Sequence, residues 1–203
     1  VDRGQALSMN EVAQIMNTEF IHPDGQRLVV SLALMDSGDQ TDEVYDFCLL
    51  NSDWVLPSKG TSTMLSNYRL STINKAGSNA NGMTLVLVDG GKYKDMIAAR
   101  MRKPNGRGSW MVYKDCDLDY AEQVTAEHKV TERVNGKVVQ KWVPKTTHAD
   151  NHYLDCEVYA AAAADMQGVR SLYLQSQEPE KPKKPEPAPT PEENWIRQNE
   201  SWV

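Results

Sequence analysis

The sequence has few cysteines, and they are widely spaced. Of the 203 residues only Cys48, Cys116 and Cys156 are cysteine. An odd number of cysteines at such distances argues against a disulfide framework and against a zinc site of the C-x-x-C type. We therefore expect reduced thiols.

Long apolar runs are also missing. The longest, residues 158–164, is far shorter than the roughly 18 residues that a membrane span requires. Nothing near the first residue resembles a signal peptide. The sequence therefore predicts a cytosolic protein that does not interact with a membrane.

The chain has no excess of positive charge, since its formal net charge is −6. Nucleic-acid-binding proteins usually carry a basic face, so the overall charge does not favour that function. The segment 92–114 is nevertheless basic, and it contains Lys92, Lys94, Arg100 and Arg102. These residues could contact a phosphate backbone, or they could form a solvated basic helix and loop.

Apolar periodicity predicts alternating helices and strands in the first half of the chain. We expect a helix over 8–20, capped by Ser8 or Asn10, and a strand over 28–36 that is buried on both faces. A helix capped by Ser37 or Thr41, a short strand and loop over 54–60, a strand over 84–90 and a helix over 92–101 follow. This order is typical of an α/β sheet with parallel strand pairs.

The second half is predicted to contain a hairpin and a late helix. Residues 120–130 suit a helix or a strand, and Asn135-Gly136 between alternating residues indicates a β-hairpin. A helix should begin near residue 151.

The composition changes after Leu174. Residues 175–193 are rich in Pro, Glu and Lys and predict a disordered linker, which separates a domain over 1–174 from a terminal segment over 194–203. That segment contains Trp195, Ile196 and Trp202. The two tryptophans are seven residues apart, so a helix would place them on one face, suited to docking in a groove of a partner. The alternative is that they are incidental.

The segment NHYLDCEVYAAAAADM, residues 151–166, carries a polar stripe on a helix of small residues. Asn151, His152, Asp155 and Tyr159 share this stripe at helical spacing. Asp155 could be there because carboxylates favour a helix N-terminus, or because the helix brings a carboxylate to a site.

Asp36 ends the strand that is expected to be the most buried. Ligands of open α/β sheets bind beyond the carboxyl ends of strands, although a solvated aspartate there would also be ordinary. If the late helix brings Asp155 to the same edge, the two carboxylates form the oxygen-rich environment that Mg²⁺ and Mn²⁺ prefer. Two such ions can activate water and stabilise the leaving oxygen of a phosphodiester.

Four blocks in this order resemble a known family. LALMDSGDQTDEVYDFC, then PSKG at 57–60, then TAEHKV with a downstream WV, and finally NHYLDCEVYAAAA are similar to the C-terminal nuclease domain of the large terminase subunit of lambda-type tailed phages, the GpA family. The likeness covers about residues 1 to 172. The last block is its most specific part.

The resemblance implies an RNase H-like (RuvC-type) fold and a metal-dependent endonuclease that cuts concatemeric viral DNA into genome units. It implies two Mg²⁺ or Mn²⁺ ions held by Asp36 and Asp155, with His152 as a ligand, a base or only a neighbour. Lys59 would lie near phosphate, unless it is an ordinary surface lysine. The implied partners are double-stranded DNA, the small terminase subunit and the portal protein of the procapsid, in the host cytoplasm.

The sequence also departs from the family pattern. The first catalytic aspartate has no match here, unless Asp2 replaces it, and no GxxxxGK[ST] motif of an ATPase motor occurs. We therefore expect residues 1–174 to be the C-terminal portion of the nuclease domain, without its first strands, which could be inactive as an isolated chain. The competing hypotheses are a non-catalytic assembly module that binds portal through its tail, and an unrelated α/β domain.

Overall fold

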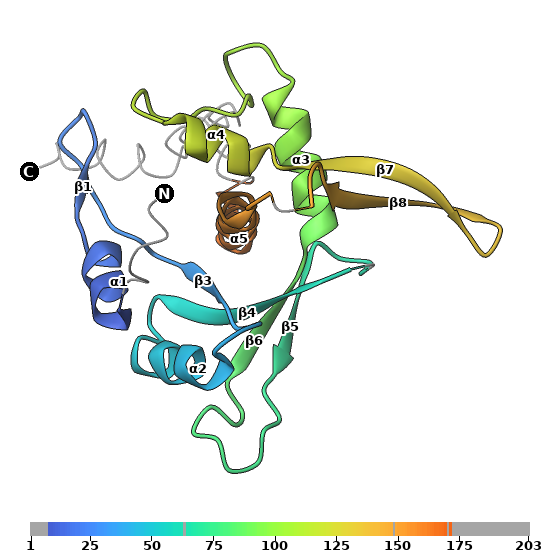
Figure 1. Ribbon diagram of the computed structural model, residues 1–203. Coiled ribbons are helices and arrows are strands. Elements are labelled where there is room, and N and C mark those ends of the chain that lie inside the picture. Colours follow the sequence, from blue (N-terminus) through green and yellow to red (C-terminus); the bar gives the residue numbers. More distant parts are fainter. Residues whose placement is uncertain (1–7, 63, 148, 170, 172–203) are drawn as a thin grey trace, which may run out of the picture. The chain divides into compact units, whose positions relative to one another are not determined.

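A computed structural model describes residues 8–62, 64–147, 149–169 and 171 (Figure 1). The chain divides into a unit over 1–168 and a unit over 169–203, and the fold described here belongs to the first. The predicted linker over 175–193 and docking segment over 194–203 lie outside the described residues.

A mixed four-stranded sheet forms the centre of the first unit. Its order is β3 (Ala33–Asp36), β4 (Val55–Thr61), β6 (Thr84–Asp89) and β5 (Tyr68–Thr72). β3, β4 and β6 are parallel, as expected, whereas β5 is antiparallel to β6 and was not predicted. The described fold is thus α/β.

The prediction of a strand over 28–36 that is buried on both faces is wrong in both length and burial. Residues Arg27–Leu28 form β2, which pairs with β1 (Phe20–Ile21) in a separate hairpin, so the sheet strand begins only at Ala33. β3 is an edge strand and is half-buried, because β4 covers only one of its edges. The PSKG segment, in contrast, lies inside β4 and is not a loop.

Two helices near the N-terminus pack on one face of the sheet. α1 (Met9–Met16) begins with a capping box formed by Ser8 and Glu11, and α2 (Thr41–Leu50) buries Val44, Phe47 and Cys48 against Val55. Neither predicted residue caps α2. Gln40 is the N-cap, while the Ser37 hydroxyl donates to the Ser58 carbonyl and the Thr41 hydroxyl to the Ser37 carbonyl.

Two later helices pack on the opposite face of the sheet. Alternate strand residues point to opposite sides, so each face of the sheet buries its own set of side chains. α3 (Gly90–Met101) and α5 (His152–Met166) share a core with β6. Its α5 members are small or branched, which allows a close approach of this helix, and the cluster consists of Val86, Val88, Tyr93, Ile97, Val158 and Ala162.

The segment left open as helix or strand contains both. α4 (Leu118–Val124) is followed by β7 (Glu127–Val134), which pairs with β8 (Lys137–Pro144). The turn predicted at Asn135-Gly136 is confirmed, with φ of 49° and 77°, and the hairpin extends away from α3 in Figure 1. In the described part of the chain, no helix is long and apolar enough to cross a membrane.

Candidate functional site

Asp36 is presented at the carboxyl end of β3. Its neighbour across the parallel pair is Ser58 of β4, and the turn that follows is tight. The Gly38 N–H donates to Asp36 Oδ1 at 3.0 Å, and a Cβ at Gly38 would lie 3.4 Å from the same oxygen. The Asp36 carboxylate is thus held by the backbone of its own turn and remains exposed to solvent.

Asp155 lies in the first turn of α5, and its side chain is about half exposed, at 48%. The Lys94 ammonium of α3 lies 3.2 Å from Asp155 Oδ1. The Asn151 amide donates to Asp155 Oδ2 at 3.3 Å. Both carboxylate oxygens therefore have a partner within the protein.

The two acids line one pocket of about 580 Å³. This pocket is formed by the ends of β3, β4 and β6, the start of α3 and the first turns of α5. Its lining consists of Asp36, Gly38, Lys59, Gly60, Thr61, Ser62, Val88, Gly90, Lys94, Asp155, Val158 and Tyr159. Two carboxylates far apart in the sequence thus face a shared cavity at the sheet edge.

Tyr159 lies one helical turn beyond Asp155 and reaches Asp36 from α5. Burial, together with the charge of Asp36 and a hydrogen bond to it, raises the pKa of the Tyr159 hydroxyl above its ordinary value. A Cβ at Gly60 would lie 3.6 Å from the Tyr159 hydroxyl oxygen, so the strand passes close to it. Tyr159 therefore stays protonated and donates to Asp36 (a role that the helical stripe alone did not reveal).

Glu127, the first residue of β7, is a third carboxylate beside this pocket. Its side chain is 6% exposed, and its Oε1 lies 2.8 Å from the Lys94 ammonium and 2.8 Å from the Asn151 amide. Sequence reasoning missed it, although it lies within the TAEHKV block.

The structure does not bring His152 into the pocket. Its side chain is 81% exposed, and its Nε2 lies 3.9 Å from Asp150 Oδ1. The catalytic role of His152 stays a prediction that this geometry does not support.

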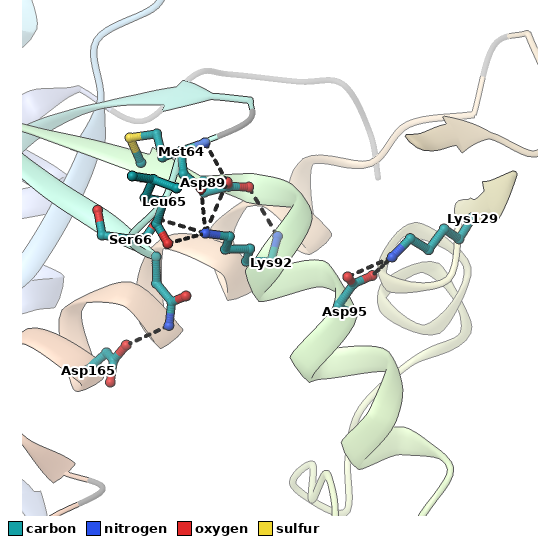
Figure 2. Close-up of polar contacts among 9 residues, drawn as sticks. Met64, Leu65, Ser66, Asp89, Lys92, Asp95, Lys129 and Asp165 are labelled. Carbon is teal, nitrogen blue, oxygen red and sulfur yellow. Dashed lines mark hydrogen bonds and ion pairs between the residues drawn. The ribbon is translucent and has the colours of Figure 1, made fainter. Parts of the chain in front are cut away.

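The predicted DNA-binding cations lie in different surroundings. Lys59 lines the acidic pocket, and Lys94 is held between Glu127 and Asp155. Lys92 donates to the carbonyls of residues 64–66, as Figure 2 shows. Arg100 is half-buried in the last turn of α3, and Arg102 is exposed beyond it.

Lys92 is therefore used to hold a loop. Its ammonium donates to Leu65 O at 2.7 Å and Ser66 O at 3.2 Å, while Asp89 Oδ2 accepts from the Met64 N–H at 3.1 Å. Asp89 also caps α3 by accepting from the Lys92 N–H.

A second pocket of about 390 Å³ lies between α3 and the β7–β8 hairpin. It shares Lys94 with the acidic pocket and is lined by several further basic side chains. They are Arg102, His128, Lys129 and Lys145. Lys129 is paired with Asp95 at 2.7 Å.

Among the described residues, no group of three or more His, Cys, Asp or Glu side chains is arranged to hold a metal ion. The metal-ligand role of Asp36 and Asp155 therefore stays a prediction. The partner-binding residues Trp195, Ile196 and Trp202 lie outside the described residues, and their docking role stays a prediction.

The comparison with protein families identifies the class of protein to which this sheet-edge pocket belongs. A family model described as the endonuclease domain of the terminase large subunit gpA matches residues 2–177, and the chain belongs to this family. No curated protein and no solved structure gives a significant match.

Proposed function

We propose that the chain is the metal-dependent endonuclease module of a DNA-packaging terminase, with an RNase H-like (RuvC-type) arrangement, that cuts concatemeric double-stranded DNA. The observation that supports this most is the shared pocket of Asp36 and Asp155. A strand-end acid and a helix acid converge there, in a chain that belongs to a terminase endonuclease family.

The donor chemistry of the pocket fits a divalent cation. Mg²⁺ is commonly bound by one or two carboxylates, with waters and substrate phosphates completing the shell. Asp36 is exposed and Asp155 is half-exposed, so both can be reached by an ion. These two residues would hold two Mg²⁺ or Mn²⁺ ions, which when bound activate water and stabilise the leaving oxygen.

The protein's own residues orient the acids. Tyr159 donates to Asp36 from α5, and the Gly38 N–H donates to the same carboxylate from the turn after β3. Two donors fix the position of the Asp36 carboxylate while leaving it open to solvent. Such positioning lowers the cost of ordering a ligand when substrate binds.

Basic side chains around the pocket suit a DNA backbone. Lys59 lines the pocket itself, and the neighbouring groove adds Arg102 and Lys145. Contacts of this kind neutralise phosphates and carry no base specificity. Lys92 is excluded from the proposed DNA surface, because its ammonium is occupied by backbone carbonyls.

The test is cleavage of linear duplex DNA by the full chain with Mg²⁺ or Mn²⁺. We expect Asp36→Asn and Asp155→Asn to lower the rate at least about 100-fold, since a lost metal ligand removes several kcal/mol of transition-state stabilisation. Circular dichroism and thermal melting should show that both variants fold.

Asp39→Asn is the matched control. Asp39 lies three residues from Asp36 in the same turn, but it is exposed and does not line the pocket, and its Oδ1 accepts from the Gln40 N–H. This variant should cleave at the wild-type rate. Wild-type cleavage by Asp36→Asn or Asp155→Asn would contradict the proposal.

A further inference from the structure

Asp155 belongs to a closed ring of polar contacts. Glu127 Oε1 contacts both the Lys94 ammonium and the Asn151 amide, each at 2.8 Å. Lys94 then contacts Asp155 Oδ1 at 3.2 Å, and Asn151 contacts Asp155 Oδ2 at 3.3 Å. Each oxygen of the Asp155 carboxylate is thus occupied by a donor that Glu127 also holds.

The behaviour of Asn151 indicates that the ring has a role of its own. Asparagine at an N-cap normally accepts a hydrogen bond from the first turn, which stabilises the helix by about 1 kcal/mol. Asn151 is the N-cap of α5, yet its side chain makes no capping hydrogen bond. Its amide is used between Glu127 and Asp155 instead.

The burial of Glu127 also indicates that the ring of contacts acts on Asp155. Its side chain is 6% exposed and that of Lys94 is 13% exposed, whereas Asp155 is 48% exposed. Burying an ion pair costs desolvation energy, so such a pair contributes little net stability compared with apolar residues. The pair does, however, hold a cation against the exposed acid.

We infer that Lys94 and Asn151, held by Glu127, compete with a metal ion for the oxygens of Asp155, so that Glu127 sets the metal affinity of the site. This rests on the proposed function, because it takes Asp155 to be a metal ligand. Lys94 and Asn151 are positioning residues for the ion-free carboxylate. Glu127 restrains Lys94, and without Glu127 the ammonium pairs with Asp155 more completely.

The test is the Mn²⁺ affinity of the full chain, measured by calorimetry. Glu127→Gln should bind Mn²⁺ more weakly than the wild type, and Lys94→Met more tightly. These two results alone could come from the change in pocket charge. The decisive variant is therefore the double mutant Lys94→Met/Glu127→Gln, which removes one positive and one negative charge and leaves the net charge unchanged.

Competition predicts that this double mutant binds Mn²⁺ about fivefold more tightly than the wild type, which corresponds to the loss of one partly exposed ion pair. If the ring is only a structural brace, the double mutant binds as the wild type does or more weakly, and that result overturns the inference. Asn151→Ala changes no charge and removes one hydrogen bond to Asp155. It should also bind Mn²⁺ more tightly, by about twofold, which is less than the effect of losing an ion pair. Unchanged or weaker binding by Asn151→Ala overturns the inference even if the double mutant fails to fold.

The matched control is Asp95→Asn/Lys129→Met, which removes the other ion pair between α3 and β7 (Figure 2). Its Mn²⁺ affinity should equal that of the wild type, and tighter binding here would overturn the inference. If Asp36→Asn and Asp155→Asn abolish binding while the ring variants bind as the wild type does, the inference fails and the proposed function stands. If the wild type does not bind Mn²⁺, both fail.

Discussion

α3 and β7 are joined by two ion pairs of opposite polarity. Lys94 of α3 pairs with Glu127 of β7, and the next helical residue, Asp95, pairs with Lys129 two positions along the strand. The side chains of the first pair are buried, since Lys94 is 13% exposed and Glu127 is 6% exposed. Those of the second pair are partly exposed, Asp95 at 45% and Lys129 at 34%. Figure 2 shows the second pair, away from the loop held by Lys92.

The two ion pairs differ in whether they contact the pocket that contains the two acids. The Lys94 ammonium contacts Asp155 as well as Glu127, and it lines the pocket that contains Asp36. The Lys129–Asp95 pair also receives the Trp142 indole N–H at 3.0 Å, and neither Lys129 nor Asp95 lines that pocket. Only the buried pair can therefore influence the acids directly.

The largest effect on stability should come from breaking the buried pair. Glu127→Ala leaves the Lys94 ammonium and the Asn151 amide without their common acceptor, and it should lower the free energy of unfolding by about 3 kcal/mol. Urea denaturation followed by circular dichroism measures this. A loss below about 1 kcal/mol would show that the pair behaves as a surface pair.

An intermediate effect is expected at Lys92, which donates to neutral carbonyls. Lys92→Met removes the donor shared by the carbonyls of residues 64–66, and we expect a loss of about 1.5 kcal/mol. Amide hydrogen exchange should accelerate in the 64–67 segment, while α5 is protected as before. Uniform acceleration throughout the domain would contradict a local role.

The smallest effect should come from the exposed pair. Lys129→Met should cost less than about 1 kcal/mol, because the pair is partly solvated and screened by salt. The difference from the wild type should shrink further when unfolding is repeated in about 1 M salt, where the Debye length is about 3 Å. A loss as large as that of Glu127→Ala would remove the distinction between the two pairs.

The sequence predicted the parts of the site that depend on local pattern. Asp36 was expected at the end of a strand and Asp155 on a helix of small residues, and both are found there. Parallel pairing of β3, β4 and β6 explains why strand ends gather at one edge. Helix periodicity was enough to place Asp155 and Tyr159 on one stripe.

Contacts between distant segments could not be predicted in the same way. Lys92 and Lys94 look equivalent in sequence, but residues two apart on a helix do not face the same direction. One therefore holds a loop and the other contacts the acids. Glu127 was missed because only the docking of β7 beside α3 buries it.

His152 shows the limit of helical spacing. It lies three residues before Asp155 in the first turn, where the helix is open to solvent, and it is exposed. β5 was missed because its half-buried and exposed residues give little apolar signal, and its place in the sheet depends on pairing with β6.

Calorimetric titration of Mn²⁺ into the full chain tests most directly whether Asp36 and Asp155 act as one metal site. We predict that Asp36→Asn and Asp155→Asn each lower the affinity at least about tenfold, because each removes a charged oxygen ligand from the same pocket, whereas Asp39→Asn binds as the wild type does. Wild-type affinity in either Asp36→Asn or Asp155→Asn would contradict a shared site.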